Sequence, residues 1–272
     1  MTFWQSVLAF LDSSMETPAS FGWFHLLWLA VTFLALIPLL CFPKQQSDDH
    51  VRRVVLVTAI VVIASEIYKQ INYSFSYENG IAFDYQWYAF PFQFCSTPMY
   101  IGLLAGLIKK GKVHDSLCAY LATYAMFAGL AVMIYPNDVF ISTIGINIQT
   151  MLCHGSMITI GIYLFATGHV KLQHKTILKA LPVFAVTVGL AAVMNEIAHL
   201  TGLLETETFN MFYISPYCDP HLLIYKDVQA VVPFPWSLVI YILGFTAAAY
   251  VILLLAMGIG KLIRKVRLPA AV

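Results

Sequence analysis

Hydrophobic residues in this chain are grouped into long, nearly uninterrupted stretches, and short segments between them carry almost all of the charge. A helix needs about 20 mostly apolar residues to cross the roughly 30 Å of hydrocarbon in a bilayer. The pattern therefore predicts an all-α fold: one domain, residues 1–272, that forms a bundle of seven transmembrane helices. The predicted spans are residues 21–41, 53–73, 88–108, 115–135, 144–167, 177–200 and 235–260.

The composition independently indicates a lipid environment. Of the 272 residues, 60% are hydrophobic and only 11% are charged, whereas soluble domains are about half apolar and a quarter charged. This excludes a soluble globular enzyme, a disordered tail and a nucleic-acid binder. We therefore expect a multi-pass integral protein of the cell membrane with no nucleic-acid partner. No Lys or Arg precedes Lys44, so a cleaved signal peptide is not expected.

The distribution of basic residues predicts the orientation, because Lys and Arg remain on the cytoplasmic side of a membrane. They are concentrated in alternate connections and in the C-terminal tail, whereas the other connections are acidic and contain only Lys226 as a basic residue. This places the N-terminus outside and the C-terminus in the cytoplasm, which requires an odd number of spans. The predicted inner residues are Lys44, Arg52, Arg53, Lys109, Lys110, Lys112, Lys171, Lys175, Lys179, Lys261, Arg264, Lys265 and Arg267.

The longest connection, residues 201–234, lies on the predicted outer side. It contains the aromatic sequence FNMFYISPYCDP, which is unlike a flexible linker. We expect it to fold back as a lid over the outer face of the bundle. The alternative is an amphipathic segment that lies in the membrane interface.

Polar residues inside the spans fall in their outer halves once this orientation is applied. Ionisable groups within hydrocarbon are costly and mark functional sites by default, and polar residues that only link helices would occupy both halves. The asymmetry predicts a polar pocket open to the outside or to the outer leaflet. The residues concerned are His25, Glu66, Lys69, Gln70, Asn72, Gln93, Cys95, Ser96, Asn147, Gln149, His154, Asn195, Glu196 and His199.

Two groups of these residues share a helix face. Glu66 and Lys69 are three residues apart, so they would form either a structural ion pair or a site for a lipid headgroup. Asn195 and His199 are four apart, and Glu196 with His199 forms one ExxH pair. Di-iron bundles need two such pairs, so we expect neither a metal nor another cofactor.

The strongest candidate for chemistry is Cys95, in FPFQFCSTP, with Pro91 and Pro98 on either side. Proline distorts a helix, and the distorted segment would present the thiol to the pocket as a nucleophile that accepts an acyl group. The alternative is a small residue packed in the core, which is our interpretation of Cys153. At a similar depth, His154 would either take the thiol proton or bridge two helices.

The segment FPFQFCS resembles the YwaF / transmembrane protein 164 family of seven-helix membrane proteins, whose third helix carries a Leu-Pro-Leu-His-Leu-Cys-Ser type of motif. Pro91, Cys95 and Ser96 match this motif, whereas Gln93 stands where the family usually has His.

Two further blocks extend the resemblance over nearly the whole chain. The first is a proline-containing loop followed by a His-Gly pair in the fifth span. The second is the loop FNMFYISPYCDP followed by PFPW. The matching positions are Tyr135, Pro136, His154, Gly155, Asn210, Pro220, Pro235 and Trp236.

The resemblance implies a lipid acyltransferase, because animal members are regarded as enzymes whose helix-three cysteine carries an acyl group from a phospholipid to a lysophospholipid. Related seven-helix hydrolases of fatty-acid esters use a Thr with a His. Carried over, Cys95 would be the nucleophile and His154 the base. The substrate would be bound by Glu66, Lys69, Gln93, Ser96, Asn147, Gln149, Asn195, Glu196, His199 and Asn210.

The alternative function is a non-enzymatic carrier or receptor that binds a small polar solute or lipid in the same pocket. A purely structural scaffold is disfavoured by the number of ionisable groups within the spans. No oligomeric state is predicted.

Overall fold

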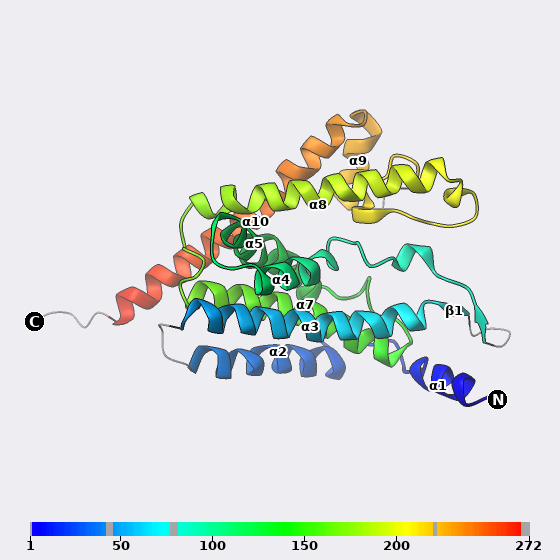
Figure 1. The fold of residues 1–272 in the computed structure, drawn as a ribbon, viewed down its shortest axis with the longest axis horizontal. Helices are drawn as coiled ribbons and strands as arrows, with labels where there is room; N and C mark the ends of the chain where they lie inside the picture. The colour runs from blue at the N-terminus through cyan, green and yellow to red at the C-terminus, as the bar shows by residue number, and fades with distance from the viewer. Residues whose placement is uncertain (1, 42–45, 77–80, 220–221, 268–272) are drawn as a thin grey trace, which may run out of the picture.

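The computed structural model describes residues 2–41, 46–76, 81–219 and 222–267 of the chain. They form an elongated bundle of helices, and the two termini lie at opposite ends of it (Figure 1). Within these described residues, six helices are long and apolar enough to cross a membrane. They are α2 (Trp23–Cys41), α3 (Asp48–Asn72), the continuous helix formed by α5 (Lys112–Tyr120), η2 (Leu121–Ala125) and α6 (Met126–Ile134), then α7 (Ile144–Ala166), α8 (Lys175–Leu200) and α10 (Trp236–Arg267).

Shorter elements complete the fold, most of them at the end of the bundle where the N-terminus lies (Figure 1). Two short antiparallel strands form a hairpin after α3, with Phe75 opposite Phe83. The elements are α1 (Phe3–Leu11), β1 (Phe75–Ser76), β2 (Ala82–Phe83), η1 (Trp87–Ala89), α4 (Thr97–Leu107), η3 (Leu203–Glu205), η4 (Met211–Tyr213) and α9 (Leu223–Val231).

The third predicted span differs from the prediction, because only its second half is helical. The helix α4 begins at Thr97 and has 11 residues, whereas the sequence predicted helix from residue 88. Phe90 is extended (φ −49°, ψ 134°), as expected of a residue that precedes a proline. Pro98 lies in the first turn of α4, where the missing N–H breaks no helical bond. Pro91 therefore lies in an irregular segment and Pro98 in the first turn of a helix. Neither proline kinks a continuous helix.

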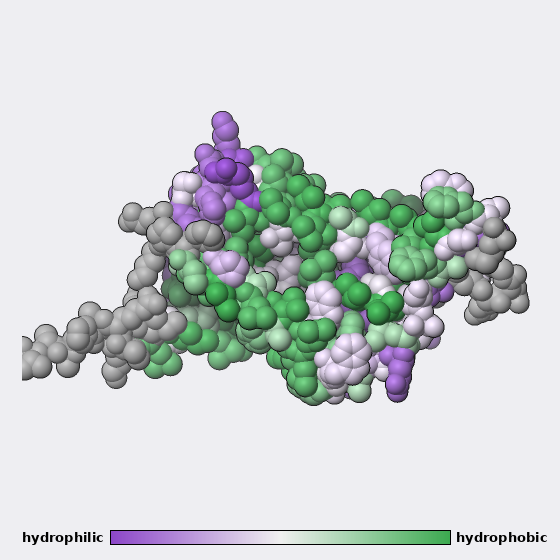
Figure 2. All heavy atoms as spheres, turned by 90° about the horizontal axis from the view of Figure 1, so that it is seen from below, coloured by the Kyte–Doolittle hydropathy of each residue, from purple (hydrophilic) through white to green (hydrophobic). Residues whose placement is uncertain are grey.

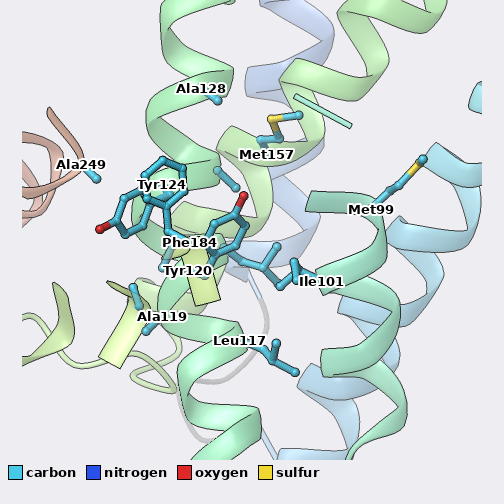
Figure 3. Packing of buried hydrophobic residues seen from close by; sticks show 14 of the residues in the cluster. Met99, Ile101, Leu117, Ala119, Tyr120, Tyr124, Ala128, Met157, Phe184 and Ala249 are labelled. Atoms are coloured by element: carbon cyan, nitrogen blue, oxygen red, sulfur yellow. The ribbon is translucent and has the colours of Figure 1, made fainter. Parts of the chain in front are cut away.

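A π-helical turn, η2, joins α5 to α6 beside the start of α4. Such turns place side chains differently from a regular α-helix. Here Tyr120 and Tyr124 stack with their ring planes 15° apart, and Tyr124 stacks in turn on Phe184 of α8 with ring centroids 4.4 Å apart (Figure 3). The Tyr120 hydroxyl and Thr97 Oγ1 are 3.0 Å apart in a hydrogen bond. This aromatic core therefore holds the first residue of α4 in place.

The surface of the bundle agrees with a lipid surrounding. Hydrophobic side chains cover its middle, and hydrophilic ones gather toward its ends (Figure 2). Apolar residues on the outward faces of the long helices are widely exposed, for example Phe33 at 61% and Leu243 at 62%. These positions would be covered by acyl chains in a bilayer.

Close packing of α4 against α3 depends on Gly106. A Cβ atom at this position would lie 2.5 Å from Leu56 Cβ and 2.8 Å from Leu56 Cα. We expect Gly106→Ala to lower the free energy of unfolding by about 1–3 kcal/mol, because the helices must move apart. Thermal or denaturant unfolding in detergent measures this change.

The matched control is Gly189→Ala in α8, since no atom lies within 4 Å of a Cβ there. Alanine is the better helix former by about 1 kcal/mol, so this variant should be at least as stable as the wild type. Equal destabilisation by both substitutions would contradict the close contact.

Candidate active site

Cys95 lies directly before α4, in the turn that starts this helix. The backbone N–H groups of Ser96 and Thr97 both donate to the Gln93 carbonyl oxygen, at 2.9 and 3.0 Å. The 11 residues of α4 give a length of about 16 Å at 1.5 Å per residue, so Cys95 lies roughly half-way through a hydrocarbon layer of about 30 Å. The half-buried Cys95 therefore lies beside the N-terminal end of α4, where the helix dipole is positive.

Glu66 of α3 is the centre of a buried polar network beside this turn. Its carboxylate accepts hydrogen bonds from Lys69 Nζ at 2.9 Å, Gln70 Nε2 at 2.8 Å and Gln149 Nε2 at 2.8 Å. The Tyr85 hydroxyl donates to Gln70 Oε1 at 2.6 Å. Three donors on one carboxylate satisfy a charge that would be very unfavourable in hydrocarbon if unpaired.

The same network connects α3 to Cys95 through α7. Gln149 and Cys153 are four residues apart on one face of α7; Gln149 contacts Glu66, and the Cys153 thiol donates to the Cys95 carbonyl oxygen at 3.6 Å. Cys95 lies within electrostatic range of both Lys69 and Glu66. A lysine ammonium has three N–H donors, so Lys69 can bind Glu66 and still interact with a second anion next to the thiol.

A groove between α3 and α4 reaches this network from the side of the bundle. It has a volume of about 290 Å³, with Glu66 and Gln70 among its lining residues. Its walls are mostly apolar, and Ile67 and Ile71 at its edge are 56% and 41% exposed. Access is therefore lateral, from the lipid. The lining consists of Ile63, Glu66, Ile67, Gln70, Ile71, Ser74, Pro91, Met99 and Tyr100.

His154 is not hydrogen-bonded to Cys95 in this structure. Its Nδ1 bonds to the Thr150 carbonyl oxygen at 2.7 Å, and its buried Nε2 has no partner among the described residues. Because a carbonyl oxygen can only accept, Nδ1 carries the proton and Nε2 has a free lone pair. On α7, His154 follows Cys153 but points about 100° away around the helix.

Two of the predicted substrate ligands instead hold the connection between α8 and α9 in place. The Gln93 amide donates to the Asn210 carbonyl at 3.0 Å and accepts from the Phe212 N–H at 2.8 Å. The Asn195 amide makes the same pair of bonds with Met211, at 3.0 and 2.7 Å. We call residues 209–215 the lid segment. Met211, Phe212 and other residues of this segment are fully buried, so it is packed into the bundle.

The remaining predicted ligands lie elsewhere. The Asn210 side chain accepts from the Ser215 N–H at 2.9 Å, within the lid segment. Asn147 binds the main chain of Ile141 through both amide atoms. The structure therefore divides the predicted residues into separate groups and does not arrange them all around one pocket.

Glu196 and His199 form a further group near the end of α8. The Tyr217 hydroxyl donates to Glu196 at 2.8 Å, and its ring stacks on His199 at 3.6 Å. The hydrogen bond to Glu196 raises the pKa of Tyr217, because the carboxylate stabilises the protonated phenol. In the described part of the chain, no group of three or more His, Cys, Asp or Glu residues is arranged to hold a metal ion.

The geometry at Cys95 and the irregular segment before it can now be compared with known proteins. The profile of the TMEM164 family matches residues 20–257 of the chain. The chain belongs to the TMEM164 family. This confirms the resemblance drawn from FPFQFCS, and the matched region contains Cys95, His154 and the whole Glu66 network. Comparisons with curated proteins and with solved structures give no match.

In this TMEM164 family member, sequence reasoning missed Tyr85 and Cys153 as parts of the site, and it placed Gln70 in the predicted pocket without assigning it a role. A signal existed for Cys153, since it follows Gln149 by four residues and so lies on the same helix face. Gln70 likewise follows Glu66 by four residues. No comparable pattern links Tyr85 to the site, because it reaches Gln70 from the loop after β2.

Proposed function

We propose that this TMEM164 family protein is a membrane lipid acyltransferase that carries the acyl group on Cys95. The observation that supports it best is the break before α4. This break brings a thiol to a helix N-terminus, within electrostatic range of Lys69, at the depth of the hydrocarbon. An apolar groove beside the site provides a route for a phospholipid acyl chain.

The reaction has two balanced steps. The Cys95 thiolate attacks the carbonyl carbon of a phospholipid acyl ester, the ester C–O bond breaks, and the lysolipid alkoxide leaves and takes up the proton released by the thiol. The hydroxyl of a second lysolipid then attacks the thioester carbonyl, and the proton of that hydroxyl returns to the departing thiolate. The Ser96 hydroxyl would stabilise the oxyanion.

His154 is the proposed base, because its Nε2 is unpartnered and its Nδ1 is held by Thr150. Buried polar atoms normally have partners, so an unpartnered nitrogen suits a group that receives a proton. Proton transfer from the Cys95 thiol to His154 Nε2 requires an intervening water or a rotation of the imidazole. Lys69 would stabilise the thiolate or bind the lipid phosphate.

The lid segment supports transfer to a lipid over hydrolysis. It is buried, and its backbone is bound by Gln93, Asn195 and the Tyr241 hydroxyl, which donates to the Phe212 carbonyl at 3.1 Å. The buried lid segment would limit the access of water to a thioester on Cys95. Lipid could still approach through the groove between α3 and α4.

We propose that the protein lies in the plasma membrane and crosses it seven times. The N-terminus would be outside the cell and the C-terminus in the cytoplasm. The irregular segment 90–96 and α4 together make the third crossing. Its non-helical backbone is compatible with a membrane because it is half-buried against the bundle and is held to the lid segment by Gln93. The termini at opposite ends of the bundle support an odd number of crossings (Figure 1).

The direct test is to trap the acyl-enzyme. The purified protein is reconstituted in liposomes and incubated with a phospholipid that carries an alkyne-tagged acyl chain. The reaction is quenched in acid, and the modified residue is located by mass spectrometry. We expect a hydroxylamine-sensitive adduct on Cys95, retained in the Cys153→Ala variant. An adduct only on Cys218 in the outer connection, or no adduct despite lipid binding, would support a carrier instead.

A further inference from the structure

A second polar crevice lies at the opposite end of the bundle, where α7 ends and α3, α5 and α8 begin. Its volume is about 400 Å³. The lid segment does not line it, and the proposed acyl chemistry does not use it. The crevice is lined by Asp48, Lys110, Asp115, Ala119, Thr167, Gly168, His169, Val170, Lys171, Gln173, Thr176 and Lys179.

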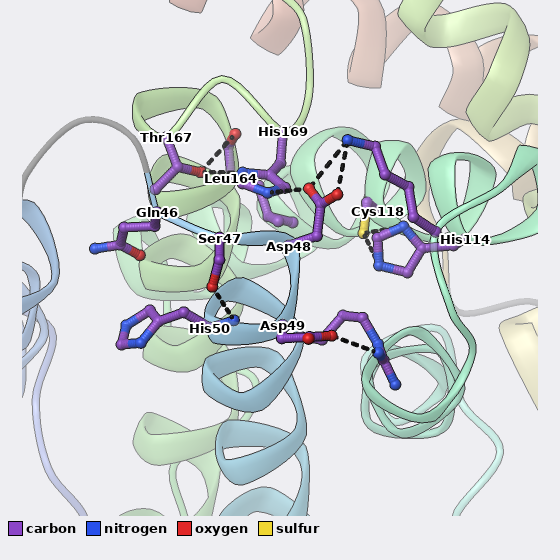
Figure 4. Close-up of polar contacts among 12 residues, drawn as sticks. Gln46, Ser47, Asp48, Asp49, His50, His114, Cys118, Leu164, Thr167 and His169 are labelled. Carbon is purple, nitrogen blue, oxygen red and sulfur yellow. Dashed lines mark hydrogen bonds and ion pairs between the residues drawn. The ribbon is translucent and has the colours of Figure 1, made fainter.

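Three lysines and a histidine face only two carboxylates in this crevice. Asp48 accepts from Lys110 at 2.9 Å and from His169 Nε2 at 2.9 Å, as Figure 4 shows for the Asp48–His169 pair. Asp115 pairs with Lys179 at 3.2 Å. The exposed Lys171 has no ion-pair partner in the part of the chain that the structure describes. Both carboxylates are thus paired, and the positive charge of Lys171 is not balanced by either of them.

Helix N-termini add to the positive potential. The first turns of α5 and α8 border the crevice through Asp115 and Thr176, and neither helix has a side-chain N-cap hydrogen bond. Uncapped N-terminal N–H groups and the helix dipole both favour a bound anion. The Gln173 side chain lies on the same wall and adds a further hydrogen-bond donor.

We propose that this crevice binds a phosphate group, with Lys171 as its principal cation. The crevice lies at the level where the long helices leave the membrane, so the phosphate belongs either to an anionic lipid headgroup of that leaflet or to a free phosphate in the adjoining solution. Both sources present anionic phosphate oxygens that accept charge-assisted hydrogen bonds from lysine.

The experiment measures binding of three probes to the full-length protein in phosphatidylcholine nanodiscs. Phosphatidic acid or phosphatidylglycerol is added to the nanodisc in two arms, and inorganic phosphate is added to the solution in the third. The readout is the shift in the thermal unfolding midpoint with probe concentration, because a ligand that binds only the folded state stabilises it. A shift with lipid alone identifies a headgroup site, and a shift with inorganic phosphate identifies a site open to solution.

Lys171→Gln should weaken the apparent affinity about fivefold, the effect of one lysine near anionic lipid. The matched control is Lys175→Gln, because Lys175 is also exposed and begins α8 but does not line the crevice. Asp115→Asn should act in the opposite direction, since it releases Lys179 to bind the phosphate. Lys171→Arg should retain binding.

Two results would overturn the proposal. One is the absence of a shift with all three probes. The other is an equal loss of affinity in Lys171→Gln and Lys175→Gln, which would show only diffuse attraction to a basic surface. Unfolding of each variant in pure phosphatidylcholine nanodiscs separates lost binding from lost folding.

Discussion

Cys95→Ala is expected to lower the rate of acyl exchange more than about a thousandfold, because it removes the proposed nucleophile. The assay follows a labelled acyl chain from a phospholipid to a lysophospholipid in liposomes that contain the purified protein. Cys153→Ala is the matched control. The Cys153 thiol makes only a 3.6 Å contact with the Cys95 carbonyl, so its loss should change the rate only a few-fold.

Stability must be compared in the same samples. Cys95 is half-buried and small, so Cys95→Ala should unfold close to the wild type. A folded Cys95→Ala protein with an undiminished rate of exchange would eliminate the thioester mechanism. Similar losses in both cysteine variants would indicate that the packing around the start of α4 matters, and not the thiol of Cys95.

Glu66→Leu is expected to destabilise the protein by about 3–5 kcal/mol, since it leaves the Lys69 charge buried and unpaired. The Lys69 side chain is only 16% exposed, so it cannot reach water without a rearrangement. The amides of Gln70 and Gln149 would lose an acceptor as well. Equilibrium unfolding in mixed micelles, compared with the wild type, measures the loss.

The control for this prediction is the double variant Glu66→Leu with Lys69→Met. Removing both charges eliminates the uncompensated ion, so the double variant should recover much of the lost stability. If the two substitutions were simply additive, the ion pair would contribute nothing, and Lys69 would have to be neutralised elsewhere.

The long helices were predictable from sequence because their signal is local. The span predicted at residues 144–167 is α7, Ile144–Ala166, and the span predicted at 177–200 is α8, Lys175–Leu200. In each case a continuous apolar stretch must satisfy its own backbone hydrogen bonds in lipid, and only a helix does so within one segment.

The break before α4 was not predictable in the same way. Pro91 and Pro98 predicted a distortion but not its extent, because a proline-containing segment in a membrane is either a kinked helix or a non-helical segment. The Gln93 side chain binds the lid segment, 117 and 119 residues further along, and such contacts compensate the irregular backbone. That compensation exists only in the folded bundle.

The sequence alone determined that this protein is a bundle of apolar helices with a cysteine next to a proline-rich distortion, because hydrophobic length and proline geometry act over a few neighbouring residues. The tertiary structure decided which polar residues meet. It joined Glu66 to Gln149 and Cys153 to Cys95, assigned Gln93 and Asn195 to the lid segment, and left His154 unpaired with Cys95. These outcomes depend on the rotation and contact of helices far apart in the chain, which no local pattern specifies.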